Sequence, residues 1–145
     1  MNWTASSKQP SVHQVYAFEG KMCAVPLRLG HYWVQTLFST HALVSFDISD
    51  LYHIREVSRV TFDDKQTPHW ISADADGRRI ILNSGEYGEH RLFLLNFDRE
   101  TGKLQLDERF RDAGRDRPGV SMDGKSWPHG FQGDAYAHGS VFSRD

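Results

Sequence analysis

A short apolar segment ending in Phe-Asp occurs twice in the chain, and this repeat constrains the fold more than any other feature of the sequence. Residues 42–47 are Ala-Leu-Val-Ser-Phe-Asp and residues 92–98 are Leu-Phe-Leu-Leu-Asn-Phe-Asp, so the two aspartates lie 51 positions apart. A polar turn and a more charged run follow each copy, at residues 55–62 and 103–110. Repetition at a period of about 40–50 residues is typical of proteins that stack one supersecondary unit on the next.

Short runs of β-branched and aromatic residues recur along the chain, bounded by Gly, Asp, Asn and Pro. No window shows the apolar spacing at i, i+3 and i+4 that indicates an amphipathic helix. Runs of this kind, separated by turn residues, predict an all-β fold. We expect strands at residues 12–18, 23–27, 32–38, 42–48, 56–62, 70–73, 79–82, 91–97, 104–110 and 140–143.

A second repeat marks where the units begin. Residues 68–71 (Pro-His-Trp-Ile) and 128–131 (Pro-His-Gly-Phe) begin with the same two residues, 60 positions apart. Four antiparallel strands in a repeat of this length form one blade of a β-propeller. The sequence therefore predicts a single partial propeller domain over residues 1–145, with a disordered N-terminus at residues 1–11. Full blades are expected at about 23–62 and about 68–110, and a partial blade at 128–145.

Charge and cysteine content exclude several classes of partner. The 17 basic and 19 acidic residues give a net charge of −2, which is no electrostatic footprint for nucleic acid or an anionic membrane. The only cysteine, Cys23, excludes an internal disulfide and a cysteine-only zinc site. No apolar run approaches the roughly 18 residues of a membrane span, and the N-terminus lacks the apolar core of a signal peptide. We expect a cytoplasmic protein by default.

Residues 68–83 contain an apolar strand, an Asp-Gly-Arg turn at residues 76–78 and a second apolar strand. This segment resembles the repeat of YVTN and lactonase-like β-propellers, in which an inner strand ends in Asp-Gly-Arg or Asp-Gly-Lys. Residues 43–50 and 92–110 are more specifically similar to the C-terminal part of selenium-binding proteins. The resemblance covers roughly residues 41–131.

The selenium-binding family implies a seven-bladed propeller, and its bacterial members include copper-dependent methanethiol oxidases. The resemblance therefore implies a metal-dependent oxidase that acts on a small molecule, and a copper-site role for His129, which aligns with a histidine near the C-terminal end of that family. The family's functional cysteines lie in an N-terminal half that is absent here, and Cys23 matches none of their motifs.

Three of the eight histidines are candidate metal ligands: His69, His129 and His138. His69 and His129 follow Pro where propeller blades are expected to start, and His138 precedes Gly nine residues further on, near the C-terminal end. Histidines at equivalent positions of adjacent blades would converge at one mouth of the central channel. Neutral imidazole is a common ligand for copper and other transition metals. The alternative is that each histidine is a turn residue bonded to a backbone carbonyl. No HxH, HExxH or CxxC spacing strengthens the metal interpretation.

Other residues have mainly structural interpretations. Asp47 and Asp98 end equivalent strands, where a carboxylate normally accepts hydrogen bonds from turn amides. Residues 85–90 are expected to form a surface hairpin or part of a binding mouth. Three of the four tryptophans are expected in the core between blades or around a substrate pocket: Trp33, Trp70 and Trp127.

Two further functions stay open at the level of sequence. The chain can be a non-catalytic binding module whose propeller face takes a small molecule or a protein, or a lactonase-like hydrolase; no catalytic residue is assigned. A closed propeller needs at least four blades of about 40–45 residues, more than 145 residues supply. We therefore expect the chain to require further blades or self-association, so that a channel site is incomplete in one copy.

Overall fold

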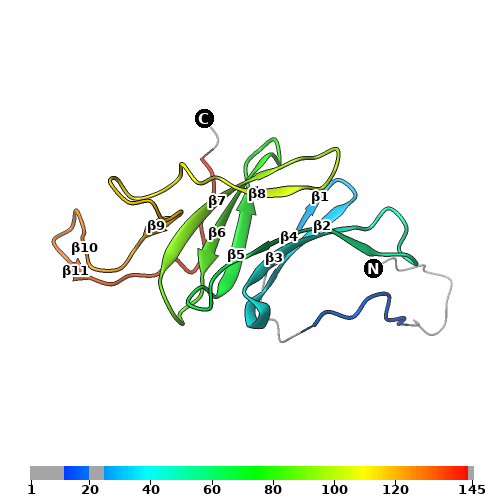
Figure 1. Ribbon diagram of the computed structural model, residues 1–145, viewed down its shortest axis with the longest axis horizontal. Coiled ribbons are helices and arrows are strands. Elements are labelled where there is room, and N and C mark those ends of the chain that lie inside the picture. The colour runs from blue at the N-terminus through cyan, green and yellow to red at the C-terminus, as the bar shows by residue number, and fades with distance from the viewer. Residues whose placement is uncertain (1–11, 20–24, 144–145) are drawn as a thin grey trace.

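Two antiparallel sheets, packed face to face, make up most of the computed structural model, which describes residues 12–19 and 25–143 (Figure 1). The first sheet runs in sequence order through β1 (Leu27–Leu29), β2 (Tyr32–Leu37), β3 (Ala42–Asp47) and β4 (Arg55–Thr61), with a 3₁₀ turn η1 (Phe38–Thr40) after β2. The second runs through β5 (Pro68–Ala73), β6 (Arg79–Ser84), β7 (Arg91–Phe97) and β8 (Leu104–Leu106). The predicted all-β class is confirmed, and each sheet has the up-and-down strand order of a propeller blade.

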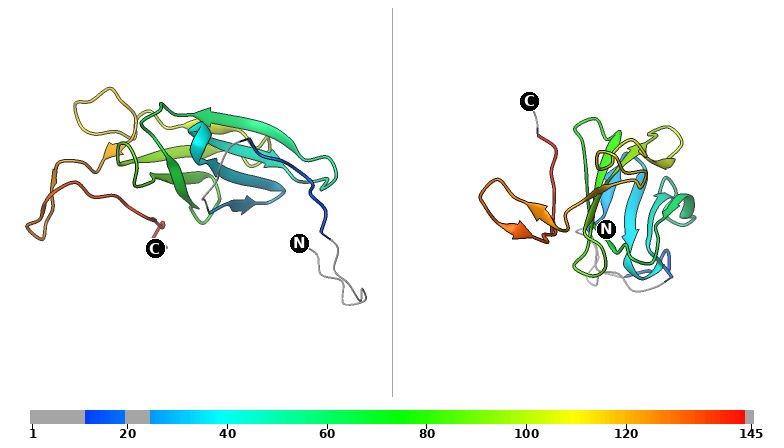
Figure 2. Two further views of the ribbon diagram at one scale, coloured as in Figure 1. Left: turned by 90° about the horizontal axis from the view of Figure 1, so that it is seen from below. Right: turned by 60° about the vertical axis from the view of Figure 1, so that its left-hand side comes forward.

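Three further strands are only two residues long. β9 (Val120–Ser121) pairs with the first residues of β7, on the edge where β8 pairs with its last residues. β10 (Lys125–Ser126) and β11 (Gln132–Gly133) form a separate hairpin that projects from the sheets (Figure 2). Segments this short carry no detectable periodicity, and the sequence did not predict them. Nothing among the described helical residues is long and apolar enough to cross a membrane.

Two predicted strands are wrong and a third is displaced. Residues 12–18 and 140–143 contain no strand. An apolar alternation indicates which side chains can be buried, but a strand also needs a backbone partner, and both segments attach through side chains instead. The strand predicted at 23–27 is β1, which begins at Leu27; residues 20–24, with Cys23, lie outside the described residues, as does the disorder predicted for residues 1–11.

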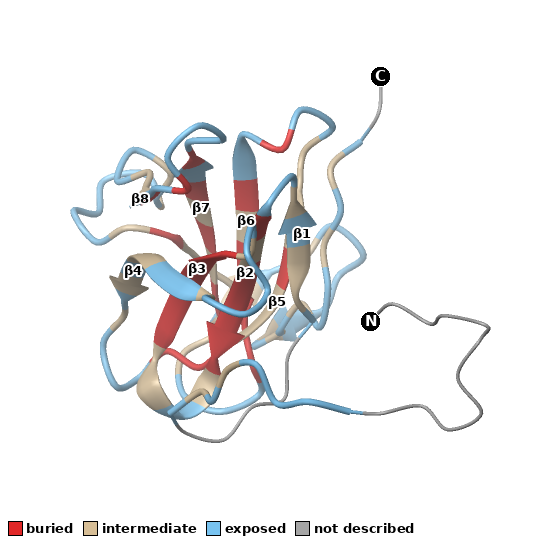
Figure 3. Ribbon diagram, turned by 90° about the vertical axis from the view of Figure 1, so that its right-hand side faces the viewer, coloured by how far each residue is buried: buried red, intermediate tan, exposed pale blue. Residues whose placement is uncertain are grey.

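The main core lies between the sheets and takes alternate side chains from both. Val34 and Leu43 from the first sheet meet Leu82, Leu95 and other apolar residues of the second, and these residues are fully buried. Figure 3 shows the burial concentrated in β2, β3, β6 and β7. The central strands of the two predicted blades therefore form one continuous apolar layer.

A second, smaller cluster covers the outer face of the first sheet, the face turned away from the second sheet. Leu37, Val44 and Phe46 are buried there. Tyr16 and Phe18 lie across this face, with their rings 5.0 and 5.2 Å from the Phe46 ring in edge-on contacts. Residues 12–19 therefore act as an extended cover and not as a fifth strand.

The turn after β7 fastens the second sheet to the first. The Ser45 hydroxyl donates to the carbonyl oxygen of Gly102 at 2.5 Å, and the Tyr32 hydroxyl donates to that of Glu100 at 2.8 Å. Gly102 has a φ of +72°, and a Cβ there would lie 2.7 Å from Cδ1 of Tyr32. Only glycine fits this conformation and this close approach without strain.

The aspartates that end β3 and the β7 segment cap their turns, as predicted. Asp47 Oδ1 accepts a hydrogen bond from the Ser49 amide at 2.9 Å, and Asp98 Oδ1 accepts one from the Glu100 amide at 2.8 Å. Hydrogen bonding to Ser49 is the main reason that the pKa of Asp47 falls well below its usual range. The pKa of Asp98 is also lowered, chiefly by the hydrogen bond from Glu100.

Candidate functional site

A β-bulge at the start of β5 gives His69 an unusual position. Pro68 is paired with Ser84, but Trp70 is paired with Asn83, so His69 is an extra residue in the ladder. Bulges re-aim side chains and occur often beside functional sites. The backbone is held in place because the Thr36 hydroxyl donates to the His69 carbonyl oxygen at 3.0 Å.

The C-terminal arm, defined here as residues 135–143, crosses the outer face of the second sheet beside this bulge. Asn83 is 1% exposed, and both the nitrogen and the oxygen of its side-chain amide bind the arm. Its Nδ2 donates to the Ala137 carbonyl oxygen at 2.8 Å, and its Oδ1 accepts from the Ser140 hydroxyl at 2.7 Å. Gly139 lies against the Trp70 ring, where a Cβ would come within 3.1 Å of a ring carbon. The arm is therefore specifically docked.

Docking of the arm assembles a cluster of rings that we call the imidazole cluster: His69, Trp70, His90, Tyr136 and His138. The centre of the His138 ring lies 5.2 Å from that of His69, 6.2 Å from Trp70 and 6.3 Å from Tyr136. Tyr136 in turn stacks on His90 at 5.7 Å. Two of the three predicted metal ligands, His69 and His138, are thus brought together.

The pKa of His69 is lowered from its ordinary value. Partial burial is the main cause, and the nearby His138 adds to it, while Glu86 acts in the opposite direction. A lowered pKa favours the neutral imidazole, which is the form that binds transition metals.

His90 forms a second polar centre in the cluster. Its Nδ1 lies 2.6 Å from Asp123 Oδ1, and its backbone amide donates to Asp123 Oδ2 at 3.2 Å. These contacts tie the loop at residues 85–90 to the segment that leads to β10. Sequence reasoning assigned no role to His90 or Asp123; the only signal was the binding-mouth interpretation of this loop.

Two buried donors lie on β5 beside the arm. Trp70 Nε1 and Ser72 Oγ have no hydrogen-bond partner among the described residues. Residues 70 and 72 alternate along the strand and so lie on the same face of the sheet. Because an unpaired buried donor is costly, a bound molecule or a water that accepted these hydrogen bonds would be stabilised here.

His129 occupies a different place. It lies in the turn of the β10–β11 hairpin, exposed, and its ring is parallel to that of Phe131 at a centre-to-centre distance of 6.3 Å. The Trp127 amide closes this turn by donating to the Phe131 carbonyl oxygen at 2.8 Å. Within residues 12–19 and 25–143, no three His, Cys, Asp or Glu side chains are grouped so as to hold a metal ion. A ligand role for His129 therefore stays a prediction.

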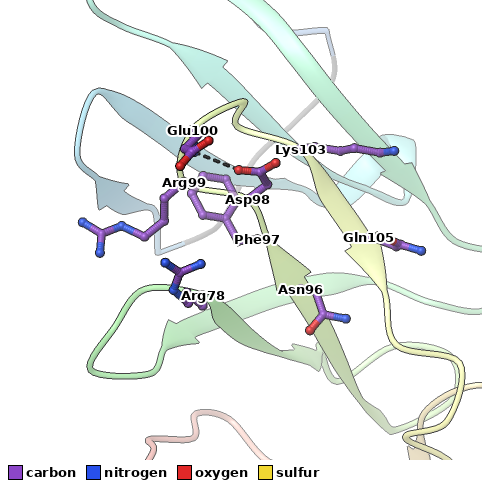
Figure 4. Close-up of a pocket in the computed structure, with 8 residues that line it drawn as sticks. All are labelled: Arg78, Asn96, Phe97, Asp98, Arg99, Glu100, Lys103 and Gln105. Carbon is purple, nitrogen blue, oxygen red and sulfur yellow. Dashed lines mark hydrogen bonds between the residues drawn. The ribbon is translucent and has the colours of Figure 1, made fainter.

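A charged hollow of about 520 Å³ lies at the opposite end of the second sheet (Figure 4). Arg78 and Arg99 extend along one side of it, and Asp98 and Glu100 lie in the adjoining turn. The Asp98 carboxylate is engaged by turn amides, and Arg99 donates through Nη1 to the Asp76 carbonyl oxygen at 3.0 Å. Asp98 and Arg99 therefore stabilise turns, and the Asp98 carboxylate is not free to act as a general base.

Comparison with known proteins adds one distant likeness. No protein family and no curated protein matches the sequence. The structure is similar to that of a hypothetical selenium-binding protein from Sulfolobus tokodaii, with a TM-score of 0.47 and 16% sequence identity. The match covers 53% of this chain and 22% of the other chain. A likeness at this level establishes neither family membership nor an activity.

Proposed function

We propose that this chain is a two-blade segment of a β-propeller and that its imidazole cluster binds a transition metal ion, with copper the first candidate. One observation carries the proposal: His69 and His138, far apart in sequence, lie with their rings 5.2 Å apart beside unpaired buried donors. Blade-like strand order in both sheets supports the propeller part of the proposal.

The residues fit a metal with nitrogen ligands. Two imidazoles, one of them with a pKa lowered by partial burial, provide two ligands of the type that copper and zinc favour. Two nitrogen ligands leave coordination positions for water, for a substrate or for a group from another blade. A metal centre open in this way is suited to catalysis and not only to a structural role.

Oxidation of a small molecule is the activity that we propose for the completed site. Copper, when bound, would supply one-electron redox chemistry. The chain's own part would be to hold the metal through His69 and His138 and to limit water access through the rings of Trp70 and Tyr136. The unpaired Trp70 Nε1 would donate a hydrogen bond to a substrate oxygen or to an ordered water.

Metal titration of the full chain tests the proposal. We expect wild-type protein to bind Cu²⁺ or Zn²⁺ in calorimetry, and expect His69→Ala and His138→Ala each to weaken binding by roughly 10-fold or more. His53→Ala is the matched control, because His53 is exposed in the turn between β3 and β4 and contacts Asp50 instead. His129→Ala decides whether the hairpin histidine takes part.

Circular dichroism of each variant must show an intact fold, so that lost binding reports lost ligands. Absence of binding in wild-type protein, or equal binding in wild-type, His69→Ala and His138→Ala proteins, would refute the metal proposal. If metal binds but no thiol or other small molecule is oxidised, the site is a metal-binding module without the oxidase activity.

The two alternative functions have less support. A lactonase-like hydrolase needs a free carboxylate near arginines. Turn amides engage Asp98 in the hollow beside Arg78, and in a second charged hollow Lys125 binds Asp112 and His90 binds Asp123. A protein-binding module needs a contiguous exposed apolar patch. Exposed apolar side chains such as Tyr52, Tyr87 and Phe131 lie instead in separate turns.

A further inference from the structure

At equivalent positions of the two repeats, a residue that faces the core between the sheets in one repeat lies on the outer face of its sheet in the other. Val44 and Phe46 lie in the cluster on the outer face of the first sheet. Their equivalents 51 positions later, Leu95 and Phe97, lie in the core between the sheets. Leu43 shows the reverse relation, since it is buried between the sheets while its equivalent, Leu94, lies half-buried on the outer face of the second sheet.

This exchange defines how the sheets are stacked. At the contact between the sheets, the first sheet presents the face that contains Leu43, and the second sheet presents the non-equivalent face, which contains Phe97. The contact is therefore heterologous, like head to tail, and not a symmetric pairing of identical faces. A heterologous stack always leaves one unused face of each kind at its two ends, and those end faces are complementary to each other.

The two unused faces can be named. At one end is the outer face of the first sheet, with Trp33, Val44 and Phe46. At the other end is the outer face of the second sheet, where Leu92 and Leu94 on β7 are half-buried. The C-terminal arm occupies the β5 and β6 part of that face through Trp70, Arg79 and Asn83, but none of its hydrogen bonds or ring contacts reaches β7 among the described residues.

On the outer face of the first sheet, a docking sheet can take the place of the side chains that now cover it. Tyr16 and Phe18 cover Phe46 by ring contacts, and residues 12–19 form no strand. The first sheet covers the equivalent position, Phe97, in the same chain, where the Tyr32 ring lies 5.7 Å from it in the core between the sheets. A sheet would bury more of this face than two side chains do, and burial of apolar area is the main favourable contribution to association.

We propose that the outer face of the first sheet binds the outer face of the second sheet of another copy of this chain, with Tyr16 and Phe18 displaced from Phe46. Two copies would then present four successive blades, the smallest number with which a propeller usually closes. The occupant is a second copy because the chain itself carries both halves of the contact. In this contact the C-terminal arm keeps its place on β5 and β6 and the partner sheet binds over β7, so the proposal does not depend on metal binding and either can fail without the other.

Sedimentation velocity on the full chain over a range of concentrations provides the test. We expect a mass that rises with concentration, and expect the double variant Tyr16→Ala, Phe18→Ala to associate at concentrations about tenfold lower, because its face is already uncovered. Trp33→Arg and Leu94→Arg, at half-buried positions on the two opposite end faces, should each be monomeric. Tyr52→Arg, in an exposed turn, should associate like the wild type.

Mixing the two monomeric variants gives the decisive result. The Trp33→Arg chain keeps its second-sheet face and the Leu94→Arg chain keeps its first-sheet face, so the mixture should form 1:1 heterodimers. Near-ultraviolet circular dichroism shows that each variant is folded before mixing. A mixture that stays monomeric overturns the head-to-tail contact, and a monomeric Tyr16→Ala, Phe18→Ala variant at every concentration overturns self-association.

Discussion

His69 shows how much of a candidate site depends on one residue's surroundings. The bulge places it beside Trp70, the arm brings His138 to it, and partial burial lowers its pKa. The sequence identified His69 and His138 as candidates from their neighbours Pro and Gly. It did not identify Tyr136, His90 or Asp123 as their neighbours, because the arm docks through tertiary contacts that leave no local spacing pattern.

The lowered pKa of His69 predicts a specific pH dependence of stability. A histidine whose pKa is lower in the folded chain binds fewer protons there than in the unfolded chain. Its contribution to stability is therefore complete above the unfolded value of about 6.5 and is lost as the pH falls through the folded value.

Urea unfolding between about pH 5 and pH 7 measures this effect. The free energy of unfolding should rise with pH in the wild type and rise less steeply in His69→Gln, which cannot titrate. Identical slopes in the wild type and His69→Gln would contradict the assignment.

Gly102 and Gly114 form a matched pair for the docking of the β7–β8 turn. Both have a left-handed backbone, with φ of +72° and +71°, but a Cβ at Gly102 would overlap Tyr32 whereas one at Gly114 would meet nothing within 4 Å. Gly114→Ala should cost about 1 kcal/mol for backbone strain alone. Gly102→Ala should cost clearly more in thermal unfolding, and equal costs would show that the turn is not packed on Tyr32.

At the scale of the element, the sequence predicted the central strands well and the terminal segments poorly. Residues 42–48 and 91–97 were predicted as strands, and β3 and β7 lie there. These strands have backbone partners on both sides, so the apolar pattern of the sequence coincides with a strand in the structure. Residues 12–18 and 140–143 have similar composition but lie on sheet faces, where contact is made by side chains and not by a ladder.

Adjacent leucines in β7 test which face of the second sheet carries the stability. Leu95 is fully buried between the sheets, while Leu94 is half-buried on the outer face. Leu95→Ala should lower the free energy of unfolding by about 2–5 kcal/mol, the range for a buried leucine, and Leu94→Ala by clearly less. Chemical denaturation measures the free energy of unfolding of the two variants. A larger loss for Leu94→Ala would contradict the assignment of the main core to the inner face of β7.

For the whole molecule, the repeat in the sequence corresponds to a repeat in space. The 51-residue spacing predicted two equivalent sheet units, and the strand order of both sheets agrees with it. It did not predict that equivalent residues face opposite ways, because a strand's alternation does not specify which neighbour each face will meet. That relation makes the stack heterologous and explains why both ends keep an apolar face under short covering segments.

A double-mutant cycle between Tyr32 and Phe97 tests most directly that the two sheets pack as successive repeats. Their rings lie 5.7 Å apart across the sheet interface. Tyr32→Leu and Phe97→Leu should be coupled by about 0.5–1.5 kcal/mol in the free energy of unfolding. Phe46→Leu and Phe97→Leu, equivalent positions in separate clusters, should be additive. Additive effects for Tyr32 and Phe97, or coupling between Phe46 and Phe97, would contradict the head-to-tail packing.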